Sequence, residues 1–81
     1  MTLGEKLLLL LRNRGWTQKY VSKKLGVRPV TVSGYVRNAF LPSVDVLWRV
    51  SRLLEVSTDY LLDETIGWPP PAGASRAAKT K

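Results

Sequence analysis

The chain has 81 residues, 44% of them hydrophobic, which allows one small domain and leaves no room for a buried catalytic cavity. It lacks cysteine and histidine, which excludes disulfides and thiolate metal sites and removes the commonest general base, so we expect no enzyme, metal or cofactor. The net charge of +7 divides into +7 over residues 1–38, −3 over 39–66 and +3 over 67–81, which favours a polyanionic partner for the first part.

A first helix is predicted to begin after Thr2, because Glu5 follows at the spacing of a capping box. Gly15 is placed to end it, since glycine tolerates the left-handed backbone of a helix cap. Four leucines share one face of this helix at the helical period: Leu3, Leu7, Leu10 and Leu11.

A second helix is predicted from the cap Thr17 to Gly26, with Val21 and Leu25 on its inner face. Its outer face is basic and carries Lys19, Lys23 and Lys24. These lysines have two open interpretations, contact with phosphate and an ordinary solvated helix face.

A third helix is predicted to begin at Pro29, because the missing N–H of proline has no partner in a first helical turn. The following residues are poor helix formers, so an edge strand over residues 30–36 is the alternative. We favour the helix, since propensity is weaker than tertiary context.

Two further helices follow, capped by Ser43 and Ser57. The inward face of the first is predicted to hold Leu47, Val50, Ser51 and Leu54, and the second carries Tyr60, Leu61 and Leu62. We expect residues 1–66 to form the domain and residues 67–81 to be a flexible, proline-rich, basic tail. No apolar run approaches the roughly 20 residues that cross a bilayer, so we expect a cytoplasmic protein without membrane contact.

Several short stretches, taken together, resemble the Cro and phage-repressor type of helix-turn-helix domain, also called XRE-like. They fall in register over about residues 3–63: Leu-Gly-Glu-Lys-Leu at 3–7, Arg14-Gly15-Trp16-Thr17-Gln18, Lys23-Lys24-Leu25-Gly26-Val27, Thr31-Val32-Ser33-Gly34-Tyr35, Pro42-Ser43, and Val56-Ser57-Thr58-Asp59-Tyr60-Leu61-Leu62. The resemblance implies an all-α, compact five-helix, lambda-repressor-like domain. It also implies a transcriptional regulator that binds double-stranded DNA, with a recognition helix at about 29–36 in the major groove.

The resemblance implies which residues contact DNA. Gln18 would touch phosphate at the start of the second helix, where free N–H groups attract anions, although an ordinary solvated position is the alternative. Counting 100° per residue places Val30, Ser33, Gly34 and Arg37 on one face of the third helix. The full set of expected DNA-binding positions is Thr17, Gln18, Arg28, Pro29, Val30, Ser33, Gly34, Arg37 and Asn38, with Lys19 and Lys23 as candidate phosphate contacts.

The expected groove face departs from the family pattern, because it is almost without hydrogen-bonding side chains. Pro29, Val30 and Gly34 cannot make the bidentate contacts that distinguish guanine or adenine. Sequence readout would then depend on Ser33, on Arg28, on apolar contact between Val30 and a thymine methyl group, or on DNA shape.

Surplus apolar residues indicate a protein contact, and we expect a homodimer. The candidate contact residues are Leu8, Leu9, Trp48 and Trp68, for which burial within the domain is the alternative interpretation. The competing functional hypothesis is a protein-interaction module of the same fold, antitoxin-like or an adaptor, with weak DNA binding or none.

Overall fold

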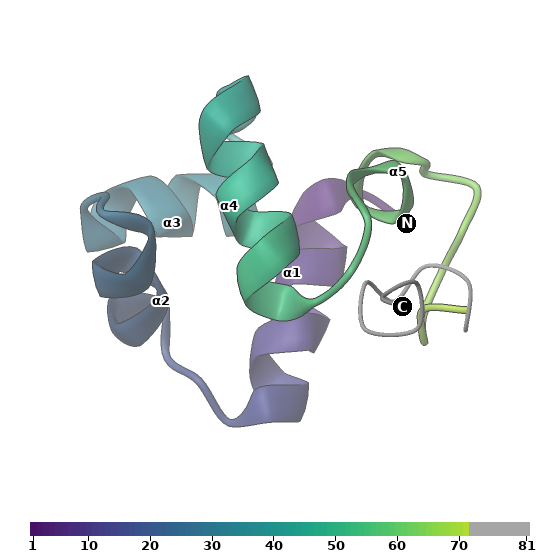
Figure 1. The fold of residues 1–81 in the computed structure, drawn as a ribbon, viewed down its shortest axis with the longest axis horizontal. Helices are drawn as coiled ribbons and strands as arrows, with labels where there is room; N and C mark the ends of the chain where they lie inside the picture. The colour runs from purple at the N-terminus through teal and green to yellow at the C-terminus, as the bar shows by residue number, and fades with distance from the viewer. Residues whose placement is uncertain (72–81) are drawn as a thin grey trace.

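The structure is a computed structural model that describes residues 1–71, and these contain five α-helices. They are α1 (Leu3–Arg14), α2 (Gln18–Leu25), α3 (Pro29–Val36), α4 (Val44–Leu54) and α5 (Thr58–Leu62). Figure 1 shows α2 and α3 together at one side of the molecule and α5 at the other, with α1 and α4 between them. The predicted five-helix architecture is confirmed, and the alternative of a strand over residues 30–36 is wrong.

Side-chain caps explain where most of these helices begin. Thr2 and Glu5 form the predicted capping box at α1, and the hydroxyl groups of Thr17 and Ser57 each accept a backbone N–H of the first turn. Ser43 stands at the predicted position before α4, but its hydroxyl donates to Asp45 Oδ1 at 2.7 Å instead of capping the backbone. The helix boundaries therefore follow from local sequence, while one cap bonds differently from the prediction.

The core is built from one face of each helix. All four leucines predicted for the inner face of α1 are buried, as are Val21 and Leu25 of α2. In α4 the prediction is only partly right, because Val46 is buried while Leu47 is only partly so. The complete set of buried apolar residues is Leu3, Leu7, Leu10, Leu11, Val21, Leu25, Val32, Tyr35, Val46, Val50, Leu54, Val56, Tyr60 and Leu61.

The packed part of the chain continues past the predicted boundary at residue 66. Trp68 is partly buried against the core, and the hydroxyl of Tyr60 donates to the carbonyl oxygen of Gly67 at 3.1 Å. Residues 67 and 68 therefore contact the domain, while the flexible tail stays a prediction whose residues 72–81 lie outside the described part of the chain. In residues 1–71, no helix has the length and apolar character needed to cross a membrane.

The beginning of α1 lies against the end of α3 at a distance that only glycine allows. A Cβ atom on Gly4 would lie within 3 Å of the carbonyl oxygens of Tyr35 and Val36. The Gly4 N–H donates to Asn38 Oδ1 at 3.0 Å, and Asn38 Nδ2 donates to Thr2 Oγ1 at 2.9 Å. This contact sets the position of α3 relative to the rest of the domain.

A buried lysine joins α1 to the end of α5. Lys6 is completely buried, and its Nζ donates to the carbonyl oxygens of Tyr60 and Asp63, the latter at 2.6 Å. These carbonyls stand at the C-terminus of α5, where a cation also opposes the negative end of the helix dipole. Burial lowers the pKa of Lys6, against the opposing effect of the nearby carboxylates of Asp63 and Glu64.

The Gly4 contact predicts that Gly4→Ala lowers the free energy of unfolding by about 2 kcal/mol. The added methyl group overpacks the contact, which outweighs the gain in helix propensity of about 1 kcal/mol. Urea denaturation followed by circular dichroism measures the change. The control is Gly67→Ala, where the added methyl group would meet nothing within 4 Å. Equal stability of the two variants would contradict the role given to Gly4.

The buried lysine predicts that Lys6→Met lowers the free energy of unfolding by about 2–4 kcal/mol. Methionine keeps most of the buried stem, but it removes the lysine N–H from two carbonyl oxygens. The Asp63 carbonyl still accepts the Ile66 N–H at 3.1 Å, so the penalty falls mainly on the buried Tyr60 carbonyl. The same denaturation measurement applies, with Arg12→Met on the exposed face of α1 as the control. A Lys6→Met protein as stable as the control would show that the hydrogen bonds to α5 contribute nothing.

Candidate nucleic-acid interface

Helices α2 and α3 form a helix-turn-helix unit with a short turn. The turn begins at Gly26, whose φ of 73° is in the left-handed region where glycine has no steric penalty. Val21, Leu25 and Val32 are all buried between these helices and the rest of the core. The angle between α2 and α3 is therefore held by packing, as the sequence predicts.

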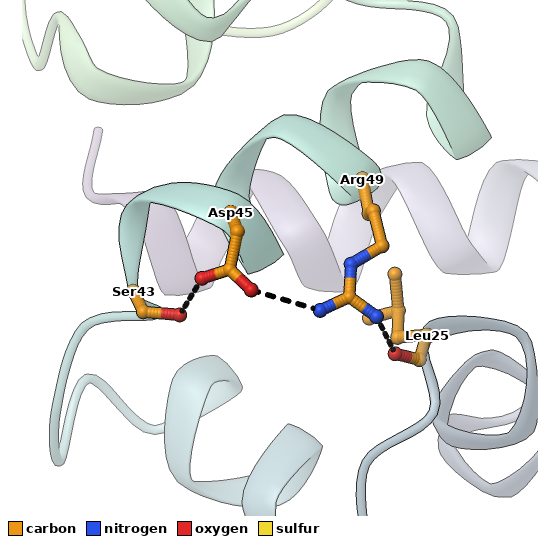
Figure 2. Close-up of polar contacts among 4 residues, drawn as sticks. All are labelled: Leu25, Ser43, Asp45 and Arg49. Atoms are coloured by element: carbon orange, nitrogen blue, oxygen red, sulfur yellow. Dashed lines mark hydrogen bonds and ion pairs between the residues drawn. The ribbon is translucent and has the colours of Figure 1, made fainter.

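A polar bridge that the sequence pattern does not predict holds this unit against α4. Arg49 donates from Nη1 to the carbonyl oxygen of Leu25 at 2.7 Å and from Nη2 to Asp45 Oδ2 at 3.1 Å. Figure 2 shows the bridge from Ser43 through Asp45 and Arg49 to Leu25. Hydrogen bonds from Ser43, and then from Arg49, hold the pKa of Asp45 below its ordinary value. The i,i+4 spacing of Asp45 and Arg49 indicates the ion pair, but not the bond to α2.

The outer face of α3 is exposed and carries most of the predicted groove residues. Arg28 and Pro29 at its start are exposed, and Val30 has 64% of its surface exposed. One turn further on, Arg37 Nε donates to Ser33 Oγ at 3.3 Å. By helical angle, Val30, Ser33 and Arg37 lie along one side of the helix, and Arg28 and Pro29 stand at its start.

Gly34 lies on the predicted face of α3 but is buried there, and a DNA contact from Gly34 stays a prediction. Its backbone is buried because the ring of Phe40 lies over it, and a Cβ atom at Gly34 would come within 3 Å of three ring atoms. Helical angles alone place residue 34 correctly but do not reveal that a later loop residue returns to cover it. Phe40 has 51% of its surface exposed and was missed by the sequence analysis.

The beginning and outer face of α2 present the other predicted contacts. Thr17 is exposed, and its hydroxyl accepts the Tyr20 N–H at 3.0 Å, so it serves as the cap. Gln18 is half-buried as the first residue of the helix, while Lys19 and Lys23 are exposed. The free N–H groups of this first turn and the two lysines form a surface suited to an anion.

Asn38 links the end of α3 to the beginning of α1, a role that the sequence pattern does not predict. Its φ of 60° lies in the left-handed region, and both ends of its side-chain amide bond to the beginning of α1. The amide is therefore committed within the protein, although the residue stands next to Arg37 at the end of α3. A DNA contact from Asn38 stays a prediction.

The cations of α2 and α3 form no ion pair with a carboxylate of residues 1–71. Within residues 1–71, the ion pairs are Arg14 with Glu55 and Arg49 with Asp45. None of the lysines and arginines of α2 and α3 takes part in them. The exposed cations of α2 and α3, together with their flanking residues, are Lys19, Lys23, Lys24, Arg28 and Arg37. Such a surface attracts phosphate groups.

The four candidate protein-contact residues differ in exposure. Leu8 and Leu9 are half-buried on α1, and Trp48 on α4 has 51% of its surface exposed. The Arg52 guanidinium lies 4.9 Å from the Trp48 ring centroid. Trp68 packs against the core, as the alternative interpretation states, so Trp48 is the most available of the four.

Known proteins share both the sequence pattern and the fold. The helix-turn-helix family model matches residues 7–61. Over 62 residues the chain is 40% identical to the HTH-type transcriptional regulator ImmR of Bacillus subtilis (strain 168). That alignment covers 76% of this chain and 49% of ImmR, so the chain spans about half the length of this relative.

Two solved structures contain a similar domain. The P22 c2 repressor in complex with synthetic operator 9T has a TM-score of 0.76 and 28% identity, covering 78% of this chain and 96% of that chain. SinR, the master regulator for biofilm formation, in complex with DNA has a TM-score of 0.70 and 30% identity, covering 76% of this chain and all of that chain (100%). The family match and the shared five-helix fold show that this chain belongs to the helix-turn-helix family, of the Cro and phage-repressor type.

Proposed function

We propose that this protein is a transcriptional regulator that binds double-stranded DNA in a sequence-specific way, with α3 in the major groove. The observation that supports this most is the exposed face of α3, which has Arg28 and Arg37 at its ends and, among residues 1–71, no carboxylate paired with either. A major groove about 12 Å wide admits a helix held at a set angle. The P22 c2 repressor and SinR are similar domains that were solved with DNA.

In this proposal, phosphate contacts come from both helices of the unit. Gln18 and the free N–H groups that follow the cap Thr17 bind one phosphate at the start of α2. Lys19 and Lys23 are further contacts on α2, and Arg37 is the contact at the end of α3. These contacts supply affinity and orientation but carry no sequence information.

Base readout is proposed for the few groups that α3 exposes. Val30 contacts a thymine methyl group, while Ser33 and Arg28 offer hydrogen bonds to base edges or nearby phosphates. Pro29 lies beside them without a donor. Because direct contacts are few, DNA shape contributes to the preference at positions that no side chain touches.

The competing function is a protein-interaction module of the same fold that binds DNA weakly or not at all. The cations of α2 and α3, which have no ion-pair partner in the described part of the chain, favour DNA, and the exposed Trp48 favours a protein contact. The DNA-binding proposal also includes the expectations of a cytoplasmic location, where bacterial and phage DNA is found, and of no enzymatic activity, cofactor or metal.

Salt dependence separates the two functions. For a regulator that engages several phosphates, log K falls linearly with log salt concentration, with a slope of about −0.9 for each phosphate neutralised. We predict that Arg37→Ala makes this slope less steep by about 1. Fluorescence anisotropy with a labelled duplex measures the slope, and Arg12→Ala on α1 is the control that leaves it unchanged.

A weak, salt-independent interaction with DNA would contradict the proposed function. A stable, salt-independent complex with another protein would then favour the protein-interaction module. Circular dichroism melting of Arg37→Ala checks that the variant is folded, because the substitution also removes the hydrogen bond from Arg37 to Ser33.

We also propose that the protein binds DNA as a homodimer, through a surface that includes Trp48. A two-fold dimer places two recognition helices about 34 Å apart, which matches successive major grooves. Sedimentation at micromolar concentration, with and without DNA, is expected to give a dimer, and Trp48→Ala is expected to shift it toward monomer. A strict monomer on DNA would contradict this proposal.

A further inference from the structure

The ring of Phe40 occupies the place that a side chain at residue 34 would take. Residue 34 lies on the same face of α3 as Val30, one turn earlier, but as glycine it projects no atom from that face. A Cβ atom built there would lie within 3 Å of the Phe40 ring. The loop after α3 therefore supplies, from outside the helix, the side chain that the helix lacks.

The ring is held in this position by the turn that ends α3. Asn38 adopts a left-handed conformation with φ of 60°, and the Ala39 N–H donates to the Gly34 carbonyl oxygen at 2.9 Å. This reversal brings Phe40 back over the helix. Tyr35 then meets it edge-on, with ring centroids 5.6 Å apart and planes at 83°. The ring is thus pre-organised while half of its surface remains exposed.

The surface around this ring is apolar within a basic region. Val30 is 64% exposed on α3, and Leu41 next to Phe40 is 69% exposed. Arg28 and Arg37 stand at the two ends of the helix without carboxylate partners among residues 1–71. The charge of these arginines complements the phosphate backbones of a DNA duplex. The apolar surface of Val30, Phe40 and Leu41 lies between the arginines, so it would meet the base edges between the two backbones. In the major groove, the apolar group on a base edge is the thymine methyl.

We propose that Phe40 is a specificity-determining residue that contacts a thymine methyl group in the major groove. This inference rests on the proposed DNA binding and adds a residue from outside the recognition helix. The ring offers no hydrogen bond, so it distinguishes thymine from the other bases by the methyl group alone. Thymine is then selected at a position that the side chains of α3 itself do not read.

The experiment begins with the full chain and a random DNA pool at physiological salt, which yields the preferred site. Each thymine of that site is then replaced in turn by deoxyuridine, which removes only the methyl group. For the unchanged protein we expect about fourfold weaker binding at the thymine that Phe40 contacts, as for the loss of one buried methyl-sized group. Phe40→Ala is expected to bind thymine and uracil equally at that position.

Two further variants control for folding and for general apolar surface. Phe40→Leu retains an apolar side chain over Gly34 and is expected to keep part of the preference for thymine. Val44→Ala changes an apolar residue that is 85% exposed at the start of α4. This variant is expected to keep the full preference for thymine over uracil. Circular dichroism melting shows whether each variant is folded.

The outcomes separate this inference from the proposed function. Salt-dependent binding to a selected site, with the same thymine-to-uracil ratios in Phe40→Ala as in the unchanged protein, would overturn the role of Phe40 alone. Binding without any selected sequence would overturn this inference and also the sequence specificity of the proposed function, while leaving phosphate contact in place. Failure to retain DNA at low salt would overturn the proposed function together with this inference.

Discussion

The position of α3 depends on the close contact between Gly4 and the end of that helix. α3 has eight residues, several of them poor helix formers, and no side-chain cap at its start, so its own sequence stabilises it little. Its last carbonyls lie against the backbone of α1, and Asn38 ties the two elements together through both ends of its amide. The surface that α3 presents is therefore set by long-range packing rather than by helix propensity.

A contact between distant residues also holds the helix-turn-helix unit where α2 ends and the turn begins. Arg49 bonds the last turn of α2 to α4, while Asp45 and Ser43 hold the arginine from its other side. α1 contacts the end of α3 and α4 contacts the end of α2. Both helices are therefore fixed by contacts away from the exposed face of α3. A side chain on the exposed face then approaches a partner with little loss of conformational freedom, which favours specific recognition.

Local features of the sequence predict most of the fold, because caps and periodic leucines act within one or two turns. The helix limits, the inner faces of α1 and α2 and the exposure of Val30 all follow in this way. The failures concern contacts between distant residues. Lys6 shares the face of the leucines, yet the pattern does not reveal that carbonyls of α5 accept its hydrogen bonds. The Phe40 ring covers Gly34 because the turn after α3 folds back over the helix. Helical angles within α3 give no information about that turn.

The proposed division of roles between cations and apolar side chains on the face of α2 and α3 affects how affinity and selectivity respond to salt. Contacts between cations and phosphates weaken as salt rises, because they depend on counterion release. Burial of an aromatic ring or a valine against methyl groups is not screened and does not weaken in this way. In the proposed complex, Arg37 and the lysines act on every sequence alike, while Phe40 and Val30 act on thymine-containing sites. Rising salt is then expected to remove the shared part of the binding energy first. A surface of this composition should therefore keep its preference among sites under conditions where its total affinity has already fallen.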